Sequence, residues 1–338
     1  MLSGISSVLI TAIKKQKNKL LKGIVLIKTK IIIGSRGSEL ALWQAYYVKK
    51  EIEKLNKGIT VELKIIKTKG DKILNVALSQ IGDKSLFTKE LEIELQNKNI
   101  DIAVHSLKDL QTKLPDGLII GAVTKRHPVE DVLIARKKGT TLANIHERAI
   151  IATGSLRRKS QILHFRPDIQ IEDLRGNVPS RIQKFLASNW DGIILARAGV
   201  ERLKLNKFIS SVISSEQIVP AVGQGALGIE VLETNKIARE VLLPLHNENT
   251  YTAVIAERAL LRTLEGGCQV PIGALANVKP NGLYLDAYVG TIDGSLAFRS
   301  SIRGSKSEPE KLGNQLASNF LKAGARKILD DIYIAVRG

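Results

Sequence analysis

Arginines are concentrated in short segments that follow predicted β-strands. They are Arg36, Arg157, Arg158, Arg175, Arg181 and Arg202. In open α/β sheets the ligand crevice lies outside the carboxyl ends of the strands, where helix N-termini also favour anions. A guanidinium group binds a carboxylate through two parallel, charge-assisted N–H bonds. A single arginine is more often a solvated surface charge, but the convergence of several at one predicted edge indicates a site for an anionic ligand.

A lysine and an aspartate stand side by side where another predicted strand ends. The strand DIAVHS covers residues 101–106, and Lys108 and Asp109 follow in HSLKDL. Lys108 can bind an anion, and Asp109 can stabilise a developing cation or move a proton. An ordinary solvated loop pair is an equally good interpretation of this spacing alone.

The single cysteine, Cys268, lies in the glycine-containing segment LEGGCQVPIG at residues 264–273. Glycines allow an exposed loop without shielding side chains, where a thiol can be nucleophilic or covalently modified. The alternative is a small buried apolar residue, which is the commoner fate of a lone cysteine. One cysteine excludes an intramolecular disulfide framework and a thiolate-only metal cage, and we expect no metal site.

Alternating strand and helix patterns position these residues. Strands are predicted at 30–33, 61–68, 101–106 and 118–123, with a helix after the capping residue Ser38 and another along Phe87, Leu91 and Leu95. After a charged stretch at 124–148 the pattern restarts, with strands at 149–153, 169–171 and 191–196 and helices from 154 and over 178–188. Repeating β–α units predict doubly wound sheets. Residues 220–228, PAVGQGALG, indicate a loop that returns between the two units.

The C-terminal part has a different pattern. Strands are predicted at 272–278, 283–289 and 296–302, separated by the turn signals Asn281-Gly282 and Asp293-Gly294. A long helix over 308–333, with a break near Gly324, covers one face. We therefore predict an α/β protein with two doubly wound domains and a small α+β C-terminal domain. The predicted division is a disordered basic extension at 1–29, domain 1 at 30–125 with 221–243, domain 2 at 127–219 and a C-terminal domain at 247–338.

The charge balance favours an anionic partner. The 338 residues carry a formal net charge of +18, and the first thirty contain seven lysines and no acid. In that extension the apolar stretch precedes the basic one, which is the reverse of a secretory signal, and it is too short to span a bilayer. We expect a soluble cytoplasmic protein, with organellar targeting by residues 1–30 left open. The basic charge also suggests a nucleic-acid-binding function as an alternative, but neither an aromatic-rich basic face nor a known module is evident.

Nine segments, in this order, are similar to the porphobilinogen deaminase (hydroxymethylbilane synthase) family. They are GSRGSELALWQA (34–45), KTKGD (67–71), KSLFTKELE (84–92), DIAVHSLKDL (101–110), GSLRRKSQ (154–161), LRGNVPSR (174–181), DGIILARAGVERL (191–203), PAVGQGALGIE (220–230) and LEGGCQVPIG (264–273). The resemblance covers about residues 31–335. It implies two domains that resemble periplasmic binding proteins, plus a C-terminal domain that carries the cofactor cysteine.

The same resemblance implies an enzyme of tetrapyrrole (haem and porphyrin) biosynthesis. A dipyrromethane cofactor, attached to Cys268 by a thioether, primes a chain that four porphobilinogen molecules extend head to tail with loss of ammonia. Hydrolysis then releases hydroxymethylbilane. Because each pyrrole ring carries two carboxylates, an arginine-lined cleft could neutralise the growing chain. Non-catalytic binding of a small anion is the competing hypothesis, and it predicts that Cys268 is dispensable.

The resemblance also assigns roles to individual residues. Catalytic roles fall to Asp109 and Lys108, with Asp109 stabilising the azafulvenium cation left when ammonia departs. The expected cofactor-binding residues are Cys268, Lys108, Asp109, Ser106, Ser155, Arg157 and Arg158. The expected substrate-binding residues are Arg36, Lys84, Phe87, Arg175, Arg181, Arg202 and Gln224. The protein is expected to act as a monomer on porphobilinogen, with no nucleic acid or membrane partner. The sequence departs from the family pattern at Glu39, Gln80, Asp83, Ser85 and Gly154.

Overall fold

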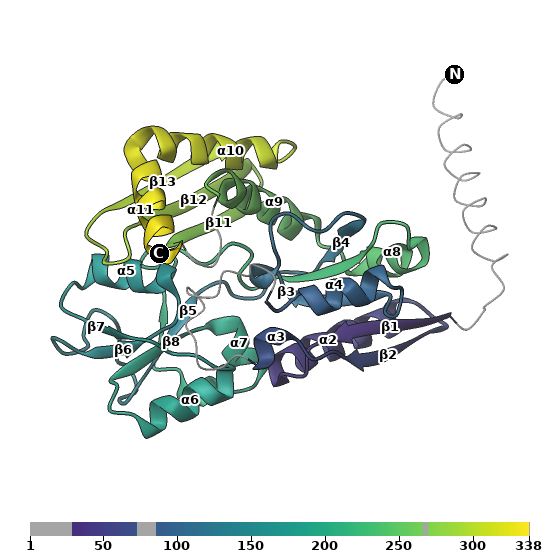
Figure 1. Ribbon diagram of the computed structural model, residues 1–338, viewed down its shortest axis with the longest axis horizontal. Helices are drawn as coiled ribbons and strands as arrows, with labels where there is room; N and C mark the ends of the chain where they lie inside the picture. The colour runs from purple at the N-terminus through teal and green to yellow at the C-terminus, as the bar shows by residue number, and fades with distance from the viewer. Residues whose placement is uncertain (1–28, 73–85, 266–269, 338) are drawn as a thin grey trace, which may run out of the picture.

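The computed structural model in Figure 1 describes residues 29–72, 86–265 and 270–337. Three β-sheets, each with its own helices, make up three lobes. The predictions for Lys84 and Cys268, for the departures Gln80, Asp83 and Ser85, and for the extension up to residue 28 lie outside the described residues.

The first lobe is a five-stranded sheet in the order β2-β1-β3-β10-β4. Its strands are β1 (Thr29–Ser35), β2 (Ile59–Ile65), β3 (Ile102–Ser106), β4 (Leu118–Val123) and β10 (Leu227–Leu232). β10 runs antiparallel to both β3 and β4. Helices α2 (Glu39–Leu55) and α8 (Lys236–Leu242) pack on one face, whereas α4 (Lys89–Gln96) packs on the other. The short helix α3 (Lys69–Lys72) precedes α4.

Helix α2 shows how local sequence fixes this arrangement. The Ser38 side chain accepts a hydrogen bond from the Ala41 backbone N–H and caps the helix. Ala45, Val48 and Ile52 recur at helical spacing and are fully buried against the sheet. The helix therefore begins directly after the turn that contains Arg36 and holds that turn at the carboxyl end of β1.

The second lobe is another five-stranded sheet, in the order β7-β6-β8-β5-β9. Its strands are β5 (Asp131–Ala135), β6 (Ile150–Ala152), β7 (Gln170–Glu172), β8 (Gly192–Ala196) and β9 (Ser211–Ile213). Helix α5 (Leu156–Phe165) packs on one face, and α6 (Val178–Ala187) and α7 (Arg197–Arg202) lie on the other. The chain crosses from the first lobe between β4 and β5, and it returns between β9 and β10.

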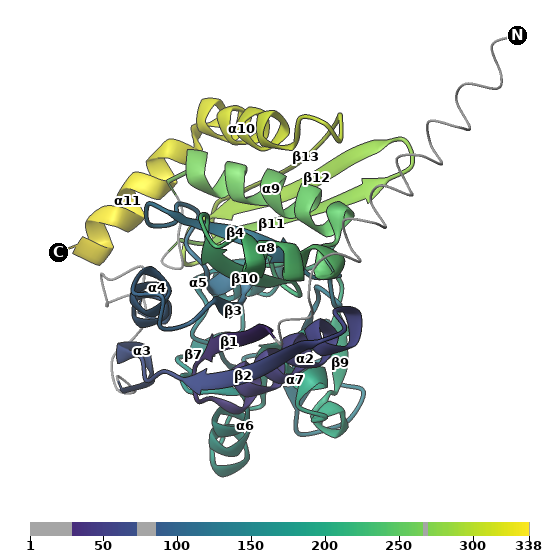
Figure 2. The same ribbon diagram turned by 90° about the vertical axis from the view of Figure 1, so that its right-hand side faces the viewer.

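The third lobe is a three-stranded antiparallel meander of β11 (Ile272–Lys279), β12 (Gly282–Gly290) and β13 (Ala297–Gly304). Helices α9 (Glu248–Thr263), α10 (Pro309–Phe320) and α11 (Arg326–Arg337) complete its apolar core. α9 packs against β4 of the first lobe, and α5 of the second lobe packs against β12, so this lobe contacts both others (Figures 1 and 2).

The structure confirms the predicted α/β class with a small α+β C-terminal part. The long C-terminal helix breaks at Gly324, whose φ of 109° is left-handed, as the glycine predicted. The sequence analysis missed two strands. The charged stretch at 124–148 contains the buried strand β5. The predicted loop at 220–228 returns from the second lobe to the first over residues 220–226, but its last two residues begin β10. Both strands are antiparallel, so they fall outside the β–α repeat on which the prediction rested.

Within the described ranges, none of the helices combines the length and apolar character that crossing a bilayer requires.

Candidate active site

A single 3₁₀ turn, Leu107–Asp109, carries the predicted lysine and aspartate directly after β3. Leu107 and Leu110 are buried, Lys108 is half-buried and Asp109 is exposed. The Leu110 N–H donates to the Leu107 carbonyl, and the Leu107 N–H donates to the Ala226 carbonyl over 3.0 Å. The two leucines therefore anchor the turn in the core and leave Asp109 facing outward. We call residues 107–110 the catalytic turn, because the sequence analysis predicts a catalytic role for Asp109.

Two of the predicted arginines share one buried carboxylate. Nη2 of Arg157 lies 2.8 Å from Oδ2 of Asp131, and Nη2 of Arg158 lies 2.7 Å from Oδ1. Their Nη1 atoms donate to the carbonyls of Val219 and Ile194. All three charged side chains are at most 5% exposed. Buried charges need such pairing, because an unpaired ion in a low-dielectric interior is strongly unfavourable.

Asp131 is held as an anion by this pairing. Burial alone would raise its pKa, but the Arg157 and Arg158 guanidinium groups outweigh burial and hold the pKa far below the usual range. Nε2 of Gln224 donates to the same carboxylate over 3.0 Å, which brings a third predicted site residue to this cluster.

Lys108 lies close to the same charges. Burial lowers the pKa of Lys108 to about 8; Asp109 and Asp131 oppose this shift, whereas Arg158 and Arg157 add to it. The lysine of the first lobe and the arginines of the second lobe therefore lie within electrostatic reach of one another.

Arg181 and Arg175 complete the cluster. Burial lowers the pKa of Arg181 to about 10; Arg158 and Arg175 lower it further, whereas Asp109 raises it. Nε of Arg181 donates to the Gly176 carbonyl over 2.7 Å, which ties the side chain to the loop ahead of α6. The structure thus places Asp109 among the cations that the sequence analysis predicted to converge.

Some of these cations retain unused hydrogen-bond donors. Nε of Arg157, Nε of Arg158 and Nη1 of Arg175 are buried, and none has a partner among the described residues. A buried N–H without an acceptor is costly, so these atoms suit a ligand that brings carboxylate oxygens. The residues present therefore fit a ligand that carries carboxylates, as the expected dipyrromethane does.

Other predicted site residues have partners of their own. The Arg36 guanidinium lies 4.2 Å from the centre of the Phe87 ring. Ser106 accepts a hydrogen bond from Nε2 of Gln44 over 2.7 Å. Ser155 is the residue that precedes α5, two positions before Arg157.

Arg202 lies where the chain returns from the second lobe to the first. It is buried, its Nη2 donates to the Gly225 carbonyl over 2.9 Å, and its guanidinium lies 5.5 Å from the Trp43 ring centre. Burial lowers its pKa to about 10, and Tyr47 opposes that shift. These contacts place Arg202 between α2 and the return segment.

Sequence reasoning missed Asp131, the residue that organises the arginine pair. It begins β5 within the stretch interpreted only as charged. The available signal was an acid directly before the apolar run VLIA at 132–135, at the start of a strand. Its partners are separated from it by 26 and 27 residues, so no local motif marks the pairing.

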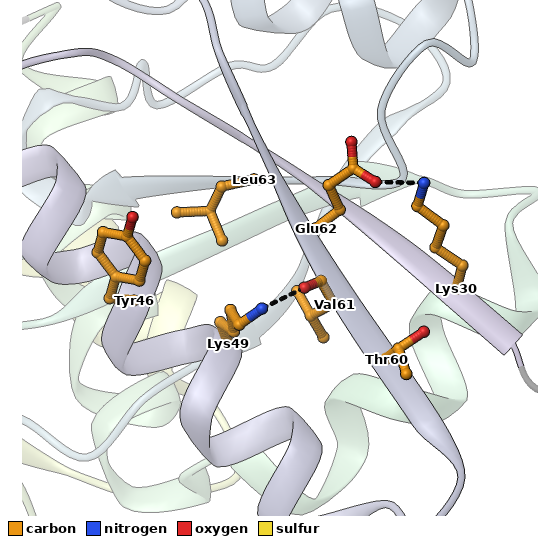
Figure 3. Close-up of a pocket in the computed structure, with 7 residues that line it drawn as sticks. All are labelled: Lys30, Tyr46, Lys49, Thr60, Val61, Glu62 and Leu63. Carbon is orange, nitrogen blue, oxygen red and sulfur yellow. Dashed lines mark hydrogen bonds and ion pairs between the residues drawn. The ribbon is translucent and has the colours of Figure 1, made fainter.

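A hollow of about 420 Å³ lies at the outer edge of the first lobe (Figure 3). It is lined by Lys30, Tyr46, Lys49, Thr60, Val61, Glu62 and Leu63. Lys30 pairs with Glu62, and the Lys49 ammonium donates to the Val61 carbonyl. β2 is the edge strand, and none of the lining residues belongs to the predicted site, so the arginine cluster is the better candidate.

In the described part of the chain, no three His, Cys, Asp or Glu residues are grouped to hold a metal.

Comparison with known proteins gives consistent matches along the chain. A family model described as porphobilinogen deaminase, dipyromethane cofactor binding domain, matches residues 31–240, and one described as porphobilinogen deaminase, C-terminal domain, matches 251–322. Proteins named porphobilinogen deaminase from Carboxydothermus hydrogenoformans and Desulforamulus reducens are 49% and 47% identical. The alignments cover 90% of this chain and 98% and 99% of those proteins. Among solved structures, the methionine-binding protein MetQ has a TM-score of 0.42 and 13% identity over 69% of this chain and 94% of its own.

Proposed function

The chain belongs to the porphobilinogen deaminase family, and from that premise we propose how its residues divide the work. Its activity is the stepwise condensation of four porphobilinogen molecules onto a dipyrromethane primer with loss of ammonia, followed by hydrolytic release of hydroxymethylbilane. It is a transferase of tetrapyrrole biosynthesis.

We propose that the arginine cluster and Lys108 hold the carboxylates of the pyrrole chain. The observation that carries this proposal is the pair Arg157 and Arg158, fixed on Asp131 with their buried Nε–H groups unused. Charge-assisted hydrogen bonds from such donors to carboxylates contribute about 1.5–3 kcal/mol each. Because the donors are already ordered, little side-chain entropy is lost when an anion binds.

We assign the catalytic role to Asp109. As the C–N bond of porphobilinogen breaks, positive charge develops on a substrate pyrrole ring. The Asp109 carboxylate can accept a hydrogen bond from a pyrrole N–H and stabilise that charge. The ammonium group of the substrate leaves as neutral ammonia, so its positive charge stays on the pyrrole ring. Asp109 is exposed on the catalytic turn and lies close enough to Arg181 and Lys108 to affect their pKa values. The arginines share the anionic load, whereas Asp131, the carboxylate that pairs with Arg157 and Arg158, is buried.

We propose Cys268 as the attachment point of the dipyrromethane, through a thioether. When bound, that group supplies the free α-carbon to which the next pyrrole is joined. Cys268 lies between α9, which ends at Thr263, and β11, which begins at Ile272. Support comes from the family match, because Cys268 lies within residues 251–322, which the C-terminal domain model of the family covers.

The remaining assignments follow the same division. We propose Ser106 and Ser155 as further cofactor contacts, and Arg36, Lys84, Phe87, Arg175, Arg181, Arg202 and Gln224 as substrate contacts. The three lobes support the domain division 30–125 with 221–243, 127–219 and 247–338. We also propose that the protein acts as a cytoplasmic monomer without a nucleic-acid partner, which sedimentation and the salt dependence of binding to arbitrary DNA would test.

The test of the function is an assay of purified protein with porphobilinogen. We expect four molecules of ammonia per linear tetrapyrrole released. Binding of porphobilinogen without ammonia release would instead support a non-catalytic anion-binding protein and overturn the proposed division of roles.

A further inference from the structure

Helix α9 of the third lobe packs directly behind the catalytic turn. Val254 of α9 shares a buried apolar cluster with Leu107 and Leu110, the two residues that anchor the turn. The turn belongs to the first lobe, so this contact joins two lobes at the point where Asp109 is displayed.

One side chain of α9 adds a polar connection at the same place. Nη1 of Arg258, one helical turn after Val254, donates to the Leu110 carbonyl over 3.1 Å, and Nη2 donates to the Gln111 carbonyl. The Arg258 side chain is buried. The two acceptors follow Asp109 by one and two residues, so the guanidinium fork fixes the backbone where the chain leaves the turn.

The other end of the turn is fixed separately. The Leu107 N–H donates to the Ala226 carbonyl over 3.0 Å, on the segment that leads into β10. Arg258 thus contacts the backbone on the exit side of the turn, opposite the Ala226 contact on the entry side. Burial lowers the pKa of Arg258 to about 10, with Arg262 adding to this and Glu230 and Tyr251 opposing it, so the side chain stays charged at neutral pH.

We propose that Arg258 is a positioning residue for Asp109: it holds the exit of the catalytic turn so that the carboxylate meets the reacting pyrrole, and it does so from the third lobe. The proposal rests on the role assigned to Asp109. Small displacements of a catalytic group are costly, since a misplacement of about 1 Å can lower the rate by about 100-fold.

Substitution of Arg258, with Arg262 of the same helix as the control, tests this role. Arg262 lies one turn further along α9 and pairs with Glu310 on the surface. The variants are Arg258→Met, which removes both donors; Arg258→Lys, which keeps the charge but not the fork; and Arg262→Met. Each is measured by intact mass, by thermal unfolding, and by kcat and KM for porphobilinogen.

We expect Arg258→Met to keep the mass of the attached dipyrrole and to lose about 10- to 100-fold in kcat, with KM changed by less than about threefold. Arg258→Lys should recover part of kcat, and Arg262→Met should match the parent. An unchanged kcat in Arg258→Met would overturn the proposal. So would an effect that changes KM alone, or a loss of kcat that Arg262→Met equals. If Arg258→Met does not fold, Arg258→Lys decides in the same way, because parent-like kcat there shows that the fork is not needed.

The role of Asp109 is checked alongside with Asp109→Asn. High activity in that variant overturns the catalytic assignment itself. Normal kcat in the Arg258 variants together with an inactive Asp109→Asn overturns only the positioning role.

Discussion

Nη2 of Arg158 lies 2.7 Å from Oδ1 of Asp131, and both side chains are almost completely buried. Arg157 occupies the other carboxylate oxygen. The protein therefore supplies an internal anion that keeps two guanidinium groups charged, ordered and close to Lys108 before any substrate binds. In the proposed binding role, an acidic substrate would meet donors that are already in place, which is the physical basis of electrostatic preorganisation.

Removing the Asp131 charge should destabilise the fold. Asp131→Asn leaves two buried guanidinium groups without their counter-ion, and breaking a buried pair in this way typically costs about 3–5 kcal/mol. Denaturant unfolding followed by circular dichroism measures the loss in free energy of unfolding. Asp286→Asn is the matched control, because Asp286 pairs with Arg299 near the surface and such pairs contribute at most about 1 kcal/mol. Equal effects of the two substitutions would contradict the organising role of Asp131.

Neutralising Asp109 should nearly abolish turnover while leaving the fold intact. Asp109→Asn keeps the shape of the side chain but removes the charge that opposes the developing cation, so we expect kcat to fall by about 100- to 10,000-fold. Steady-state assay with porphobilinogen measures kcat, and circular dichroism checks the fold. Asp116→Asn, at an exposed position ahead of β4, is the control and should be as active as the parent. Substantial residual activity in Asp109→Asn would count against the assigned role.

The activity should decline at alkaline pH because of Lys108. With its pKa lowered to about 8, the ammonium group is charged below that pH and neutral above it. A neutral amine no longer attracts a carboxylate, so kcat/KM should fall above pH 8 towards a lower level at which the arginines alone hold the carboxylates. Lys108→Arg keeps its charge throughout this range and should move the decline to higher pH. Lys113→Arg, at an exposed position nearby, should retain the parent profile; a shift there equal to that of Lys108→Arg would refute the assignment.

Helix caps, helix breaks and strand ends could be predicted because neighbouring residues in the sequence determine them. Ser38 caps α2, Gly324 breaks the C-terminal helix, and the strand before Lys108 ends where expected. The class of fold could be predicted from the alternation of strand and helix patterns along the chain. Arg157, Arg158 and Arg181 follow two parallel strands of one sheet, β6 and β7, whose carboxyl ends meet at one edge, so their proximity could be predicted. Their closeness to Asp109, which follows a strand of the other sheet, depends on how the two lobes pack together.

Long-range pairing escaped the sequence analysis. Nothing in the stretch at 124–148 indicates that Asp131 is buried beneath two arginines of α5, since that depends on how β5 enters the second sheet between β8 and β9. The contact of Arg258 with the exit of the catalytic turn is likewise set by the docking of the third lobe, with partners 147 and 148 residues apart.

Intact mass of the purified protein shows whether Cys268 carries the dipyrromethane. We expect the parent to exceed its sequence mass by two linked pyrrole units, Cys268→Ser to have the bare mass of its sequence, and Asp109→Asn, with the cysteine intact, to retain the excess. A parent protein at its unmodified mass, or a Cys268→Ser protein that still carries the two units, would contradict this attachment.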